Sequence, residues 1–185
     1  MSPLSAVAAA LDRLHIPYAI GGSMASSARG VPRSTLDVDI VARIGPQHAE
    51  ALAAALGPEW YADVDQIRDS ISAKRAFNII HRPSVTKVDV FPALDEFHFA
   101  QLQRATPTLL EFFGDKAEYP VATAEDILLA KLQWYRAGGE VSERQWTDIT
   151  GLVATNINLD MDYLRSWSHR LGVADLLNRV LRDRA

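Results

Sequence analysis

The sequence contains no cysteine, and this absence excludes several kinds of chemistry. Disulfide bonds, cysteine-ligated metals and thiol nucleophiles are ruled out, although the redox compartment stays open. An excess of positive charge is missing too, because the formal net charge is -4. No global positive field therefore attracts a polyanion, so a nucleic-acid partner would need a local basic patch.

Long apolar runs are also absent. No stretch approaches the roughly 20 apolar residues that a membrane-spanning helix needs. The N-terminal segment lacks the basic start and apolar core of a signal peptide, and it predicts an amphipathic helix with Ser2 as its cap and Pro3 in its first turn. We therefore expect a soluble, cytoplasmic protein that makes no use of a membrane.

What the chain does contain is typical of a globular domain. It has 185 residues, of which 48% are hydrophobic and 23% are charged. This length suits one full domain, or a compact domain with a helical extension, and it allows a sizeable core. Two large domains would not fit.

The hydrophobic pattern changes along the chain. Its first part alternates predicted strands with helices, and from about residue 120 it is helical. We therefore expect an α/β or α+β fold, with a mixed sheet flanked by helices in residues 1–120 and a helical part in residues 121–185. The predicted strands are 18–20, 34–42, 60–64, 75–80, 86–91 and 107–113; the predicted helices are 23–28 and 46–56, then four that begin near Thr123, Ser142, Asp160 and Val173.

Two aspartates share one face of a predicted strand. In the stretch LDVDI, Asp37 and Asp39 alternate with apolar residues, so they lie about 7 Å apart and repel each other when ionised. A divalent cation between them would remove this repulsion, and hard oxygen ligands suit Mg²⁺ or Mn²⁺. Alternatively, both carboxylates are solvated or pair with an arginine, the candidates being Arg29, Arg33 and Arg43.

A glycine pair precedes these aspartates. Gly21 and Gly22 allow a tight turn, and the helix that opens at Ser23 offers free N–H groups that suit phosphate. Taken alone, the same residues are consistent with an ordinary strand-to-helix turn. A third aspartate, Asp89, follows on a later strand between Val88 and Val90.

Together these elements resemble a known group of enzymes. Gly21 to Ser23, then Asp37 and Asp39, then Asp89 occur in the order and spacing of the DNA polymerase β-like nucleotidyltransferase superfamily, over residues 18–91. Within it, RSTLDVDI looks most like the small bacterial nucleotidyltransferases related to the AbiEii and MenT toxins. Lincosamide and aminoglycoside nucleotidyltransferases are looser neighbours.

The resemblance implies a minimal nucleotidyltransferase fold whose catalytic core is residues 1–120. It places Gly21, Gly22 and Ser23 around the β- and γ-phosphates of a nucleoside triphosphate. It makes Asp37 and Asp39 ligands of Mg²⁺ or Mn²⁺. Asp89 would complete the metal site nearer the acceptor and help to deprotonate the acceptor hydroxyl.

Further nucleotide contacts are expected outside this core. In AbiEii-like enzymes a lysine on one helix, followed by an arginine and an aspartate on the next, contributes to the nucleotide site, and Lys131, Arg144 and Asp148 occur in that order. The alternative is a lysine that extends to solvent or pairs with Asp148. Arg33 and Thr35 are candidates for phosphate or acceptor contacts, or else simple turn residues. Tyr135 is a minor candidate for base stacking, while packing is expected of Trp60, Trp134, Trp146 and Trp167.

The resemblance predicts a metal-dependent enzyme that moves a nucleoside monophosphate from NTP to a hydroxyl or phosphate and releases pyrophosphate. Toxin-like modification of tRNA, with a possible cognate antitoxin, is the first expectation, and modification of a small molecule such as an antibiotic is the second. A non-catalytic module that binds nucleotide or protein is the third. A tRNA could use a patch of C-terminal arginines, although solvated helix faces explain them equally well; these are Arg165, Arg170, Arg179, Arg182 and Arg184.

Overall fold

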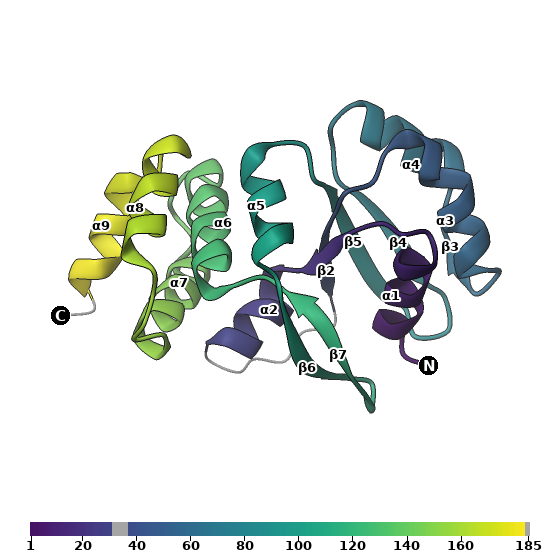
Figure 1. The fold of residues 1–185 in the computed structure, drawn as a ribbon, viewed down its shortest axis with the longest axis horizontal. Coiled ribbons are helices and arrows are strands. Elements are labelled where there is room, and N and C mark those ends of the chain that lie inside the picture. The colour runs from purple at the N-terminus through teal and green to yellow at the C-terminus, as the bar shows by residue number, and fades with distance from the viewer. Residues whose placement is uncertain (31–36, 184–185) are drawn as a thin grey trace. The chain divides into compact units, whose positions relative to one another are not determined.

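A computed structural model describes residues 1–30 and 37–183 of the chain (Figure 1). It divides into two compact units, which are described separately. The first comprises Met1–Met24 and Thr35–Ala122, and the second Ala25–Ser34 and Thr123–Ala185. The second unit thus resumes at Thr123, whereas the sequence pattern places a boundary after residue 120 and assigns only later residues to the helical part.

The first unit is built on a mixed sheet. Its strand order is β3-β4-β5-β2-β1-β7-β6, in which β2–β5 and β1–β7 are parallel pairs and the other neighbours are antiparallel. The expected α+β fold with a mixed sheet and flanking helices is confirmed. The strands are β1 (Tyr18–Ile20), β2 (Val38–Ala42), β3 (Trp60–Tyr61), β4 (Phe77–His81), β5 (Thr86–Pro92), β6 (Thr106–Phe112) and β7 (Asp115–Val121).

Side-chain caps start several helices of this unit. Ser2 caps α1 as predicted, because its Oγ accepts a hydrogen bond from the N–H of Ser5 at 3.2 Å. Asp63 and Asp95 cap α4 and α5 in the same way. The helices are α1 (Pro3–Arg13), α2 (Gly22–Arg29, which continues into the second unit), the short 3₁₀ helix η1 (Pro46–His48), α3 (Ala49–Leu56), α4 (Val64–Ser72) and α5 (Glu96–Arg104).

Two predictions in this unit are wrong. The strand predicted over 60–64 ends at Tyr61, because the Asp63 cap turns the following residues into α4, which buries Ile67 and Ile71. The sequence reading also places no strand after residue 113, yet β7 follows there and forms a hairpin with β6. The connecting residues Phe113 and Gly114 have φ values of 51° and 78°. Positive φ at both loop positions matches the twist of a two-residue hairpin.

The second unit is helical. Thr123, Ser142 and Asp160 cap its helices where the sequence predicts, and Leu128, Leu132 and Ile149 are fully buried. Besides part of α2, it contains α6 (Ala124–Ala137), α7 (Glu143–Thr155), α8 (Met161–Arg170) and α9 (Ala174–Asp183).

Trp134 does not pack in the core of this unit as predicted. Its side chain is 59% exposed, because Leu128, Leu132 and Tyr135 take the buried face of α6. Trp134 precedes Tyr135 by one residue and therefore lies roughly 100° away around the helix. Tyr135 packs on Trp146 with ring centroids 5.1 Å apart, and its hydroxyl donates to the carbonyl of Glu140. Tyr135 is thus a packing residue here.

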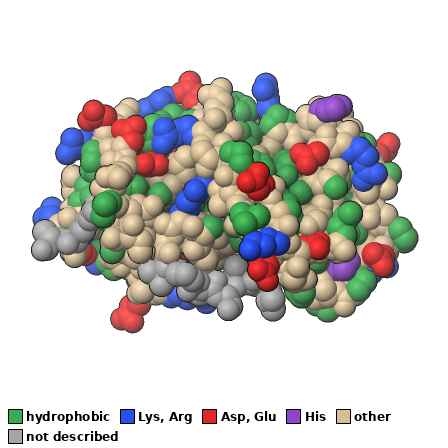
Figure 2. All heavy atoms as spheres, turned by 60° about the horizontal axis from the view of Figure 1, so that its bottom comes forward, with side chains coloured by type: hydrophobic (Ala, Val, Ile, Leu, Met, Phe, Trp, Pro, Cys, Tyr) green, Lys and Arg blue, Asp and Glu red, His purple; other side chains and the backbone are tan. Residues whose placement is uncertain are grey.

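Charged side chains of both signs are interspersed on the face drawn in Figure 2. Two of the C-terminal arginines lie over aromatic rings: Arg170 over Trp167 and Arg179 over Trp146, each 4.1 Å from the ring centroid. These contacts direct both guanidinium groups onto the protein itself. Within the described residues, no helix is long and apolar enough to cross a membrane.

Candidate active site

Two of the predicted aspartates lie side by side on the sheet. β2 and β5 run parallel, and their register pairs Asp39 with Asp89. On the opposite face Val38 and Val88 are fully buried, whereas both aspartate side chains are only partly covered. Neighbouring strands lie roughly 4.8 Å apart, so the two carboxylates share one small area of the first unit. The alternation seen in the sequence predicts the face, and the sheet topology supplies the proximity.

Asp37 differs from the other two aspartates. It immediately precedes β2 and is exposed, so it does not lie within the strand as the alternating pattern predicts. Its charge still acts on the site, because it contributes to the electrostatics of both Asp39 and Lys87.

The glycine turn lies directly against Asp39. The N–H of Gly21 donates to the backbone oxygen of Asp39 at 2.8 Å, and the N–H of Ser23 donates to its carboxylate Oδ2 at 3.4 Å. Gly22 has a φ of +55°, and a Cβ placed on it would lie 2.6 Å from the Cβ of Asp39. A side chain there would overlap the aspartate. Only glycine combines this backbone conformation with so close an approach.

The carboxylate of Asp39 is in a strained electrostatic position. Burial raises its pKa, and the negative charges of Asp89 and Asp37 raise it further. The N–H of Ser23 and the ammonium of Lys87 lower this pKa and act in the opposite direction. The site thus gathers more negative charge than its surroundings favour, which is the arrangement that a cation relieves.

Lys87 is a charged neighbour of these aspartates that the sequence reading overlooks. Its Nζ lies 2.7 Å from Oδ2 of Asp89, two residues further along β5. The hydrogen bond to Asp89 is the largest cause that raises the pKa of Lys87. The alternating pattern places Lys87 on the same face of the strand as Asp89. This signal is weak, because a single lysine on a strand is usually solvated.

The chemistry of the donor set fits a hard divalent cation, because oxygen ligands from neighbouring carboxylates suit Mg²⁺ or Mn²⁺. However, no group of three His, Cys, Asp or Glu side chains within residues 1–30 and 37–183 is arranged as a metal site. Two of the three aspartates, Asp39 and Asp89, are paired in register, and Asp37 lies outside β2. The carboxylates are therefore gathered without being set in a ligand geometry.

The two residues predicted from the helical part contact each other. Nζ of Lys131 on α6 lies 3.0 Å from Oδ2 of Asp148 on α7, and the two side chains are 16% and 21% exposed. This is the ion pair that the sequence reading considered as the alternative to a nucleotide contact. Arg33 and Thr35 lie outside the described residues, so their predicted roles have no structural counterpart.

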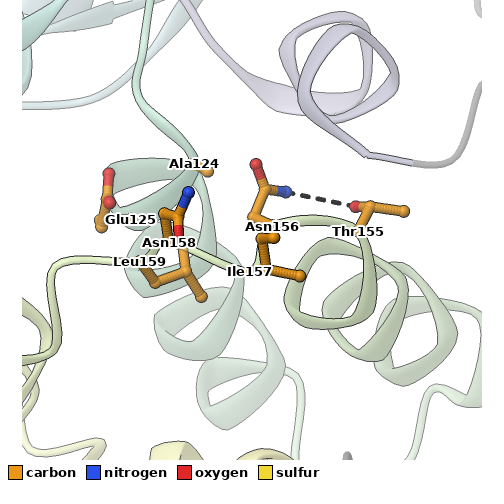
Figure 3. A pocket seen from close by; sticks show the side chains of 7 residues that line it. All are labelled: Ala124, Glu125, Thr155, Asn156, Ile157, Asn158 and Leu159. Atoms are coloured by element: carbon orange, nitrogen blue, oxygen red, sulfur yellow. Dashed lines mark hydrogen bonds between the residues drawn. The ribbon is translucent and has the colours of Figure 1, made fainter.

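A hollow of about 260 Å³ lies in the second unit, at the start of α6 and the connection between α7 and α8 (Figure 3). It contains none of the predicted site residues. Its polar groups bind neighbouring backbone: Asn156 Nδ2 donates to the carbonyls of Arg29 and Leu152, and Glu125 accepts from the N–H of Asp160. These bonds identify the hollow as part of the helix connections.

No protein-family model and no curated protein matches this sequence. Solved structures do match. An antigenic nucleotidyltransferase-like protein from Paracoccidioides brasiliensis aligns over 97% of this chain and 87% of its own, with a TM-score of 0.52 and 24% identity. The chain has a nucleotidyltransferase-like fold. The antibiotic-resistance factor ANT(2'')-Ia, in a crystal structure with adenylyl-2''-tobramycin, aligns over 91% of this chain and 94% of its own, with a TM-score of 0.50 and 16% identity.

Identities this low establish a shared fold and leave activity to the site itself. The nucleotidyltransferase-like fold agrees with the superfamily resemblance read from the sequence. A specific closeness to the AbiEii and MenT enzymes stays a prediction, because neither of these solved structures is described as one of them.

Proposed function

We propose that this chain is a metal-dependent nucleotidyltransferase that moves a nucleoside monophosphate from NTP to an acceptor hydroxyl and releases pyrophosphate. The observation that carries the proposal is the placement of Asp39 and Asp89 side by side on β2 and β5, with the Gly22 turn against Asp39. This chemistry needs carboxylates that bind a cation and a backbone turn whose N–H groups bind phosphate.

Asp39 and Asp89 would hold the cation, with Asp37 as the third ligand. A bound Mg²⁺ or Mn²⁺ would stabilise the charge on the attacking and leaving oxygens of the displacement. The raised pKa of Asp39 supports this assignment, because burial and two neighbouring carboxylates disfavour its charged form until a cation arrives.

The protein's own groups would do the rest. Gly22, with its positive φ and no side chain, would let a triphosphate approach the backbone closely. The N–H groups at the start of α2 would bind its β- and γ-phosphates. The acceptor oxygen would then bond to the α-phosphorus while the bond to the bridging oxygen breaks. Asp89 would accept the proton of the acceptor hydroxyl.

Four further residues belong to this proposal as nucleotide contacts. Lys131 and Asp148 are supported by their partial exposure and by the resemblance, and a triphosphate would have to draw the ammonium of Lys131 away from Asp148. Arg33 and Thr35 are supported by the resemblance alone.

For the acceptor, we propose a small hydroxyl compound ahead of tRNA. The net charge of -4 gives no global attraction for RNA, and Arg170 and Arg179 of the suggested patch are directed onto tryptophan rings. The complex of ANT(2'')-Ia with adenylyl-2''-tobramycin shows that a protein of this fold accommodates such a compound. Toxin-like tRNA modification, a cognate antitoxin and a cytoplasmic location stay predictions.

Release of pyrophosphate tests the proposal directly. Each NTP would be incubated with Mg²⁺ or Mn²⁺ and with aminoglycosides, lincosamides or total tRNA, and the products identified by mass spectrometry. Asp39→Asn should abolish release, while Asp69→Asn, an exposed aspartate of α4, should not change it. If the wild type releases no pyrophosphate with any acceptor yet still binds NTP, the non-catalytic module becomes the better description.

A further inference from the structure

Lys87 and Asp89 form a short ion pair inside the proposed catalytic site. Residues two apart on a strand have Cα atoms roughly 7 Å apart, so the lysine side chain must bend toward the aspartate to reach it. The contact between Nζ and Oδ2 is 2.7 Å, and the two side chains are 43% and 22% exposed. The ammonium is therefore held at the carboxylate although solvent is available to it.

The surroundings of Lys87 explain why it stays. The charges of Asp37, Asp39 and Asp89 all act on the ammonium with the same attractive sign. One monovalent cation thus faces three carboxylates. The ammonium of Lys87 reduces the repulsion between these carboxylates. A divalent metal ion bound at the same place would reduce this repulsion more strongly.

We propose that Lys87 is a built-in counter-ion which occupies the cation position at Asp89 until a divalent metal displaces it, and which thereby sets the metal affinity of the site. This inference rests on the proposed function, because it needs the aspartates to be metal ligands. It adds a residue outside the three aspartates, Lys87, whose ammonium lies 2.7 Å from Oδ2 of Asp89.

The inference fixes the sign of a mutational effect. Removing the ammonium of Lys87 should increase the affinity of the aspartates for a metal ion, because the metal no longer competes with a bound cation. Because a partly exposed ion pair contributes up to about 1 kcal/mol, losing the competitor should tighten Mn²⁺ binding by roughly three- to fivefold. Without metal, the same variant should lose little stability, because the pair is partly exposed and lies within one strand.

The experiment is a Mn²⁺ titration of the full chain without nucleotide. Binding is measured by calorimetry and by the electron paramagnetic resonance signal of free Mn²⁺. Lys87→Met should bind Mn²⁺ more tightly than the wild type. Lys87→Arg, which keeps the charge, should bind no more tightly than the wild type. Lys116→Met, an exposed lysine on β7 of the same sheet, is the matched control and should not change the affinity.

The outcomes separate this inference from the proposed function. If the wild type binds no Mn²⁺, or if Asp89→Asn leaves binding unchanged, the metal site itself is wrong. If the wild type binds Mn²⁺ and Asp89→Asn abolishes binding, but Lys87→Met binds equally or more weakly, only the counter-ion role is overturned. Lys87→Gln repeats the test should Lys87→Met fail to fold, and circular dichroism confirms that each variant is folded.

Discussion

The two units of the molecule each contain a lysine–aspartate pair, and the pairs differ in their setting. Lys87 and Asp89 share strand β5, and a second carboxylate, Asp39, lies beside them in register on β2. Lys131 and Asp148 come from α6 and α7, whose contact buries leucine and isoleucine side chains. The distances are similar, 2.7 Å and 3.0 Å. The distance alone therefore does not distinguish the two pairs.

The setting separates them. A pair within one strand joins no two elements, so it adds little to the fold, and its aspartate is available to a ligand. A pair between two helices also holds the helices in register, so breaking it leaves a partly buried charge without its partner. We therefore expect mutations of the first pair to change chemistry and mutations of the second to change stability.

The largest effect is expected for Asp89→Asn compared with Asp148→Asn. Loss of a metal-binding carboxylate that also takes the acceptor proton should lower pyrophosphate release at least about 100-fold. The same change should leave the unfolding free energy almost unaltered. Asp148→Asn should do the reverse, with a clear loss of stability and a smaller loss of rate. Steady-state kinetics and urea unfolding of both variants check this; equal rate losses would remove the distinction between the pairs.

Gly22→Ala should have the next largest effect, on both stability and activity. The change adds the cost of a positive φ to an overlap with Asp39 that includes its Cβ, so rotating the carboxylate does not relieve it. Together these cost about 2 to 4 kcal/mol of unfolding free energy. Gly172→Ala is the matched control, because Gly172, just after α8, has a φ of +68° with no atom within 4 Å of its would-be Cβ. Its cost should be about 1 to 2 kcal/mol, that of the backbone conformation alone. Equal losses in urea unfolding would contradict the close approach of Gly22 to Asp39.

Lys131→Met should lower the unfolding free energy by about 1 kcal/mol or more, because it leaves the Asp148 carboxylate partly buried without its ammonium. A double-mutant cycle with Asp148→Asn measures the coupling energy of the pair. The affinity for NTP is the second readout. If it falls tenfold or more while the fold is intact, the nucleotide contact predicted by the resemblance holds in addition to the structural role.

The smallest effect is expected at an ion pair whose side chains are 39% and 70% exposed. Both carboxylate oxygens of Asp175 on α9 accept from Arg136 on α6 at 2.7 Å, and this bond lowers the pKa of Asp175 below its ordinary value. A carboxyl with a depressed folded-state pKa stabilises the protein above its unfolded-state pKa and loses this contribution as the pH falls. Thermal unfolding from pH 6 to pH 3 should therefore show Asp175→Asn slightly less stable near pH 6, with the difference vanishing toward pH 3. A constant difference would rule out this pair as its cause.

Much of the site was predictable because it depends on local patterns. Alternation along β2 and β5 places Asp39 and Asp89 on the exposed face, and the glycine pair predicts the turn before α2. Their pairing side by side depends on the strand order, which no local pattern contains. Nor does alternation show that Asp37 lies outside the strand.

The unpredicted parts of the fold have two kinds of cause. The helices α4 and α5 were not predicted, although their capping residues, Asp63 and Asp95, are visible in the sequence. The β6–β7 hairpin gave little signal, because its loop uses Phe113 at a positive φ where asparagine or aspartate is usual. Trp134 shows a third limit: two adjacent aromatic residues lie on one helix, and tertiary packing buries Tyr135 and leaves Trp134 exposed.

The two hydrogen bonds from the glycine turn to Asp39 behave differently when the carboxylate moves. The bond from Gly21 reaches the main-chain oxygen and is independent of the side chain, whereas the bond from Ser23 reaches Oδ2 and is already long at 3.4 Å. A cation that draws the Asp39 carboxylate toward Asp89 would release the Ser23 amide while Gly21 still anchors the loop. Faster amide exchange at Ser23 than at Gly21 in saturating Mg²⁺ would reveal this. Metal binding at Asp39 would then precede phosphate binding at Ser23, because the Ser23 N–H becomes able to donate to a phosphate oxygen only after the carboxylate has moved.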